Sequence, residues 1–279
     1  MDYQKINSRM IYGLALQVFA LNLVTYIIIA FLNTVFAIAQ GIIPFFGLFG
    51  FIVMIYLGAV SFMVAHKTII NGETVAPGEA FAITPQSKTY FWQYLMVTGI
   101  PVVLAIIGVI MMVMSETFLF DPYTLALVLI AVVTGVYYVL MAFFGTSLVA
   151  TAVGGDGMMM VSRGRETFFY SLSRLIVLPT LALASFFGAI YYWLLSDGGP
   201  TLEGLIAFFG DNPNDAIMTV LLLSVAGQLF VILFNMITAV IITKAFLLAE
   251  VRLALKGEPT EWGKQAFGMT EKARGVVYR

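Results

Sequence analysis

Long apolar runs constrain this chain more than any other feature of its sequence. A helix rises about 1.5 Å per residue, so about 20 apolar residues cross the hydrocarbon core of a bilayer. Several runs here reach that length without an acidic or basic side chain. They are continuous rather than alternating, which favours helices over a membrane barrel. With 10% charged residues, against roughly a quarter in soluble domains, the chain is predicted to be a membrane protein.

The runs predict an all-α, polytopic protein with six transmembrane helices arranged as three helical hairpins. The expected spans lie at about 14–39, 45–66, 91–114, 123–150, 175–195 and 216–243. The first run has no A-x-A-like cleavage site and is longer than a signal-peptide core, so we expect it to be retained. Residues 1–243 form the membrane domain in this interpretation, and residues 244–279 form a cytoplasmic C-terminal extension.

The charges fall asymmetrically on the two sides of this arrangement. All 14 lysines and arginines lie on one side, whereas the connections on the other side carry acids and no basic residue. Basic residues in short loops mark the cytoplasmic side. We therefore expect a multi-pass membrane protein with both termini in the cytoplasm.

The stretch from Gly154 to Pro179 is the most charged interruption between spans. If it is helical from Met158, it is amphipathic and lies at the membrane interface. The expected water-facing side chains are Arg163, Glu166, Tyr170 and Arg174, and the expected lipid-facing ones include Phe168, Phe169 and Leu172. Arg163, Arg165 and Arg174 are our candidate contacts for lipid headgroups or a partner, with general topology anchoring as the alternative. Before the third span, Thr84 and Pro85 are typical of a helix cap followed by a first-turn proline.

Polar side chains inside the spans are amides and hydroxyls. Asn22 and Asn33 share a face of the first span, and Gln228 and Asn235 share a face of the sixth. Hydrogen bonds between helices, worth about 0.6–2 kcal/mol, are one interpretation. A polar conduit lined by these residues is the other. The interiors of the expected spans contain no charged residue or histidine, which argues against ion-coupled transport.

Few residues in the sequence are candidates for catalysis or for metal binding. The chain has no cysteine and one histidine, His66, which we expect at the interface beside Lys67. No nucleophile–base pair can be drawn from the sequence. We therefore predict no enzymatic activity, no cofactor, no metal site and no nucleic-acid partner.

Two basic, aromatic segments carry a resemblance to a known family: GEAFAITPQSKTYFWQYL before the third span and VSRGRETFFYSLSRL before the fifth. In layout the chain resembles the YciC-like group of bacterial inner-membrane proteins and the related membrane domains found beside glycerophosphodiester phosphodiesterases. The resemblance implies a location and a fold but no activity. We expect an accessory or scaffold subunit, or a factor in envelope lipid homeostasis. The alternative is a passive channel or carrier. Membrane lipids are the expected partners, and a second membrane protein or a second copy of the chain stays open.

Overall fold

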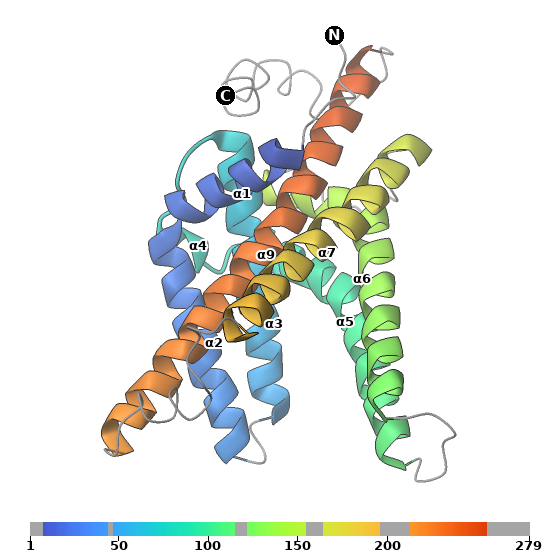
Figure 1. The fold of residues 1–279 in the computed structure, drawn as a ribbon. Coiled ribbons are helices and arrows are strands. Elements are labelled where there is room, and N and C mark those ends of the chain that lie inside the picture. Colours follow the sequence, from blue (N-terminus) through green and yellow to red (C-terminus); the bar gives the residue numbers. More distant parts are fainter. Residues whose placement is uncertain (1–7, 44–46, 115–121, 155–163, 196–212, 256–279) are drawn as a thin grey trace.

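The computed structural model describes residues 8–43, 47–114, 122–154, 164–195 and 213–255 (Figure 1). All elements of secondary structure in these residues are helices. Its helices are α1 (Ser8–Leu21), α2 (Leu23–Ile42), α3 (Gly47–Asn71), α4 (Pro77–Ala80), α5 (Pro85–Met114), α6 (Pro122–Ala152), α7 (Arg165–Leu195) and α9 (Pro213–Leu255). The all-α prediction is confirmed for these residues.

Five of the described helices contain an apolar stretch long enough to cross a bilayer. The stretches are Leu23–Gln40, Phe49–Asn71, Pro85–Ile110, Val128–Ala152 and Ser224–Glu250. They indicate a multi-pass membrane protein. The span expected at 175–195 falls within α7, which is not among the five. The arrangement of six spans in three hairpins therefore stays a prediction.

The helix expected over residues 14–39 is interrupted at Asn22, which separates α1 from α2. At this residue φ is −112° and ψ is 24°. The Val18 carbonyl accepts from both the backbone N–H of Asn22 (3.2 Å) and its side-chain Nδ2 (3.0 Å). An asparagine side chain that competes for a backbone partner in this way disturbs a helix. As a result α1 lies across the end of the bundle at an angle to α2 (Figure 1).

Helix α9 is the centre of the packing, since α1, α2, α3, α6 and α7 all contact it. The small residues Ala142, Thr146 and Ala150, one turn apart on α6, are buried. A Cβ placed on neighbouring Gly145 would lie 2.8 Å from Ile242 of α9. Small side chains let helix backbones approach closely in membranes, so this stripe brings α6 against α9.

At one end of the bundle α3 and α9 finish and α5 and α7 begin (Figure 1). We call this the basic end, because Lys67, Lys88, Arg165 and Arg252 lie there. Away from it, α5 and α6 form a hairpin that diverges from the other helices (Figure 1). Apart from Pro101, the α5 side chains from Thr98 to Ile110 are exposed or half-exposed, as is typical of a lipid-facing surface.

Candidate functional site at the basic end

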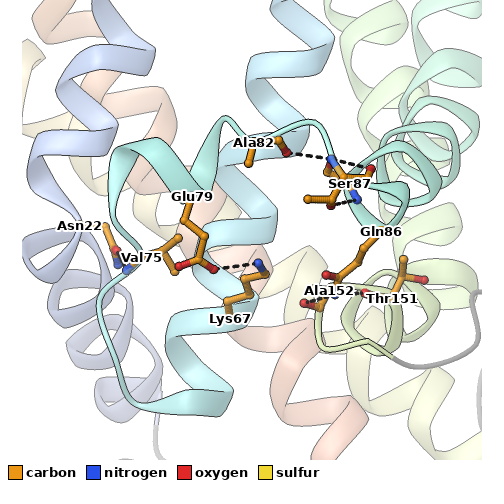
Figure 2. A network of polar contacts seen from close by, with 10 residues as sticks. Asn22, Lys67, Val75, Glu79, Ala82, Gln86, Ser87, Thr151 and Ala152 are labelled. Atoms are coloured by element: carbon orange, nitrogen blue, oxygen red, sulfur yellow. Dashed lines mark hydrogen bonds and ion pairs between the residues drawn. The ribbon is translucent and has the colours of Figure 1, made fainter.

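A layer of buried hydrogen bonds ties the helices together at the basic end, and we call it the polar layer (Figure 2). Asn22 is its first member. Its Nδ2 donates to Thr68 Oγ1 of α3 at 2.9 Å, and its Oδ1 accepts from the Val75 backbone N–H at 3.0 Å. Asn22 is 3% exposed. Its amide is therefore a structural joint between α2, α3 and the following connection.

The connection between α3 and α5 is held at two further points. Lys67 Nζ donates to Glu79 Oε1 at 3.1 Å, which joins α3 to α4 (Figure 2). At the start of α5, Thr84 Oγ1 accepts from the Ser87 N–H at 3.0 Å, and Ser87 Oγ accepts from the Thr84 N–H at 2.8 Å. This reciprocal arrangement satisfies helix-start donors in the manner of a capping box. The predicted cap at Thr84 and the first-turn proline at Pro85 are confirmed.

The far end of α6 is capped by a side chain from α5. Gln86 Nε2 donates to the carbonyls of Thr151 and Ala152 at 2.8 and 2.9 Å (Figure 2). Thr151 Oγ1 in turn donates to Gln93 Oε1 at 2.8 Å. The last carbonyls of a helix have no partner within it. These contacts therefore fix the end of α6 against the beginning of α5.

His66 is buried among the helices, and its expected depth at the membrane interface stays a prediction. It is 1% exposed, and its Nδ1 lies 2.7 Å from Thr243 Oγ1 of α9. The Thr243 hydroxyl donates its one proton to the Ala239 carbonyl at 2.7 Å. Its oxygen must therefore accept from His66, which places the imidazole proton on Nδ1. His66 joins α3 to α9 in this way.

Helix α9 also buries charged residues that the sequence analysis placed outside the membrane domain. Lys244 is 3% exposed and Glu250 is fully buried. The sixth span was expected to end at residue 243, whereas α9 continues to Leu255 and its apolar stretch reaches Glu250. The apolar residues 245–249 between the two charges were the available signal.

Two of the three candidate arginines lie in the described part of the chain, and Arg163 lies outside it. The Arg165 guanidinium carbon is 5.6 Å from the centre of the Phe169 ring. The Arg174 guanidinium carbon is 3.7 Å from that of Tyr170, and Nη1 donates to the Tyr170 carbonyl at 3.4 Å. Burial raises the pKa of the Tyr170 phenol, and the Arg174 cation opposes that shift. Both arginines therefore stack on an aromatic ring of their own helix.

The three residues expected to face lipid in this segment differ in exposure, since Phe168 and Leu172 are half-buried. Phe169 is 53% exposed as expected. Phe168, however, packs inward with its ring 4.3 Å from that of Phe143, and Leu172 also packs against the core. Glu166 is exposed, and its carboxylate lies 2.7 Å from Arg252 Nη1 of α9. That ion pair joins the start of α7 to the end of α9.

The four candidate amides do not form one set. The polar layer uses Asn22, whereas Gln228 and Asn235 are half-buried on α9. Asn33 is 9% exposed, and its Oδ1 accepts no hydrogen bond from the described residues. Helices α2 and α9 are neighbours, joined by a hydrogen bond from the Tyr26 hydroxyl to Met236 Sδ at 3.2 Å. The side chain of Asn22 is therefore occupied by hydrogen bonds within the polar layer and does not join the other three amides. Among the four, Asn33 is the one whose buried amide oxygen accepts no hydrogen bond from the described residues.

In the described part of the chain no three His, Cys, Asp or Glu side chains gather closely enough to hold a metal ion. The fold and the basic end define a helical multi-pass membrane protein. No protein-family model, curated protein or solved structure matches the chain. The resemblance to the YciC-like group stays a prediction from the sequence.

Proposed function

We propose that this is a non-enzymatic protein of the bacterial inner membrane that binds anionic phospholipid at its basic end, in support of envelope lipid homeostasis. The complete charge asymmetry of the sequence supports a cytoplasmic position for that end and for both termini. A sixth crossing by α7 completes this topology, because an even number of spans returns the chain to its starting side.

One observation carries the proposal: two helices begin at the basic end with a basic residue followed by an aromatic residue four positions later. On α5 the pair is Lys88 and Trp92, and on α7 it is Arg165 and Phe169. Lys88 and Arg165 are exposed, Trp92 is 61% exposed and Phe169 is 53% exposed. Residues four apart lie on one helix face. The two pairs, which we call the interface pairs, therefore each present a cation and a ring together.

The chemistry of the interface pairs suits the boundary between headgroups and hydrocarbon. Tryptophan is enriched at that level, and phenylalanine adds apolar contact. Each basic residue near an anionic leaflet contributes about 1 kcal/mol of attraction. Such a pair therefore favours phosphatidylglycerol or cardiolipin over a zwitterionic lipid, without any bond being made or broken.

Lipid enrichment around the protein tests the proposal. The wild type and a Lys88→Gln, Arg165→Gln double variant are reconstituted with equal phosphatidylglycerol and phosphatidylcholine, extracted in mild detergent, and their retained lipids measured. Each lost cation should lower the ratio of anionic to zwitterionic lipid at its own pair about fivefold, from ~1 kcal/mol for one basic residue. The retained ratio should therefore fall by up to about fivefold. Lys67→Gln is the control, since Lys67 is paired with Glu79 and only 16% exposed. An unchanged ratio in the double variant would refute the proposal, and a co-purified protein in place of lipid would favour an accessory subunit.

A passive conduit between α2 and α9 is a second candidate, and Asn33 is the observation that favours it. A buried amide oxygen without a partner costs about 1–3 kcal/mol in protein mutational data, which makes it a plausible contact for a passing polar solute. Flux through proteoliposomes tests this role. An Asn33→Leu, Asn235→Leu double variant that conducts as the wild type does, or a wild type without flux, would exclude it.

A further inference from the structure

Helices α1, α7 and α9 line an apolar pocket of about 200 Å³. Its walls include Tyr12 and Leu16 of α1, Ala182 of α7, and Leu233 and Phe234 of α9. The hydroxyl of Tyr12 is already used, because it donates to the Leu178 carbonyl of α7 at 2.8 Å. The pocket therefore offers aliphatic and aromatic surface to an occupant.

The pocket lies open beside surface that faces lipid. Leu16, which lines it, is 55% exposed, and Leu181 and Val231 on the adjoining helices are 54% and 48% exposed. An apolar cavity of about 150 Å³ admits a benzene-sized guest. In a bilayer the apolar groups next to such an opening are acyl chains, so a short chain segment is the occupant that fits both its size and its walls.

Arg174 lies between this pocket and the basic end. It precedes Ala182 by eight residues on α7, which is about 12 Å along a helix. Its guanidinium is turned back toward the start of the helix, where it stacks on Tyr170. The headgroup zone is about 5–8 Å thick on each side of the hydrocarbon. Tyr12, which lines the pocket, bonds to Leu178, one turn from Arg174. A phosphate bound at Arg174 would therefore bring a chain of the same lipid within reach of the pocket.

We propose that the pocket binds one acyl chain of an anionic glycerophospholipid whose phosphate is bound by Arg174. The guanidinium carries five N–H donors and matches phosphate geometry with two parallel hydrogen bonds. The Tyr170 carbonyl accepts from one of them, and the Tyr170 ring holds the plane in place. This site rests on the proposed lipid-binding function but uses a different surface from the interface pairs, and it holds one defined lipid per protomer.

Native mass spectrometry of the full chain, released from nanodiscs of equal phosphatidylglycerol and phosphatidylcholine, tests the site. We expect the wild type to retain one phosphatidylglycerol. Arg174→Gln should lower its retention relative to phosphatidylcholine about fivefold, the factor that corresponds to ~1 kcal/mol for one basic residue. Lys67→Gln is the control and should leave this lipid in place, because Lys67 is paired with Glu79 and only 16% exposed.

Two variants block the pocket without touching the charge. Ala182→Phe fills it from α7, and Leu16→Trp fills its mouth from a position that is 55% exposed. Both should abolish retention of the single lipid, whereas Val177→Phe, at a 49% exposed position on α7, should retain it. Retention unchanged in both blocking variants would overturn the site, and so would a wild type that retains no lipid. If no single lipid is retained but the protein still enriches anionic lipid through the interface pairs, the pocket site is excluded and the proposed function is not. The two results are separable because the enrichment is measured over all lipids that surround the protein.

Discussion

Replacement of Asn22 by leucine should destabilise the protein, and the same replacement at Asn33 should not. Both residues lie near or within α2, both are buried, and both lose an amide to an apolar side chain of similar size. They differ in their partners. Asn22 makes hydrogen bonds to Val18, Thr68 and Val75, whereas the Asn33 Oδ1 has no partner among the described residues.

The size of the expected loss in unfolding free energy follows from the hydrogen-bonding groups that lose their partner when the amide is removed. Removal of the Asn22 amide leaves the buried Val75 N–H without its acceptor, which costs about 1–3 kcal/mol, and forfeits the donation to Thr68, worth about 0.5–1.5 kcal/mol. The Val18 carbonyl keeps its backbone donor. The expected loss for Asn22→Leu is therefore about 2–4 kcal/mol. Asn33→Leu removes an unsatisfied oxygen and should be neutral or stabilising by up to about 1 kcal/mol.

Equilibrium unfolding in mixed micelles measures the difference between the two variants, and hydrogen exchange at the Val75 amide localises it. The exchange rate at Val75 should rise in Asn22→Leu and stay unchanged in Asn33→Leu. Equal stabilities for the two variants would refute the argument that Asn22 holds the connection after α3. So would a loss in Asn22→Leu that leaves the Val75 amide protected.

Two further predictions concern the interior of the bundle. Because the chain has one histidine, nitrogen NMR of histidine-labelled protein with a non-histidine tag reports on His66 alone. The neutral imidazole should carry its proton on Nδ1. A proton on Nε2 would contradict the hydrogen bond from Nδ1 to Thr243. Gly145→Ala should cost about 1–3 kcal/mol by forcing a methyl against Ile242, whereas Gly135→Ala, which meets open space, should stabilise α6 by about 0.5–1 kcal/mol. Equal unfolding free energies for the two alanine variants would exclude close packing at Gly145.

Features that depend on local chemistry could be predicted from the sequence. The apolar runs specify helices because lipid leaves a backbone no other partner. Thr84 and Pro85 mark the start of α5 because a cap and a first-turn proline act within one turn. The sequence alone could not show which of Phe168 and Phe169 is exposed and which packs inside the bundle. Both adjoin the apolar face, and only contact with Phe143 on α6 decides which ring is inside.

The missed features depend on residues far away in the chain. Asn22 and Asn33 look alike in an apolar run, and the partner that distinguishes them, Val75, follows Asn22 by 53 residues. Lys244 looks like the end of a span because a charge is costly in lipid. Its burial became possible only because several helices surround α9 and supply protein in place of lipid.

The polar layer also bears on how the basic end would bind lipid. Lys88 lies in the first turn of α5, whose start is fixed by Thr84 and Ser87, and Arg165 is adjacent to Glu166, which the end of α9 holds through Arg252. A protein binds a ligand more weakly when its contacting groups become ordered only on binding. The cost is about 0.5–1.5 kcal/mol for each long side chain, and it is larger when the backbone becomes ordered as well. Here the backbone beneath both cations is already fixed by the protein. The hydrogen bonds at the start of α5 and the ion pair at the start of α7 thus hold the backbone under Lys88 and Arg165 at constant positions whether or not lipid is bound.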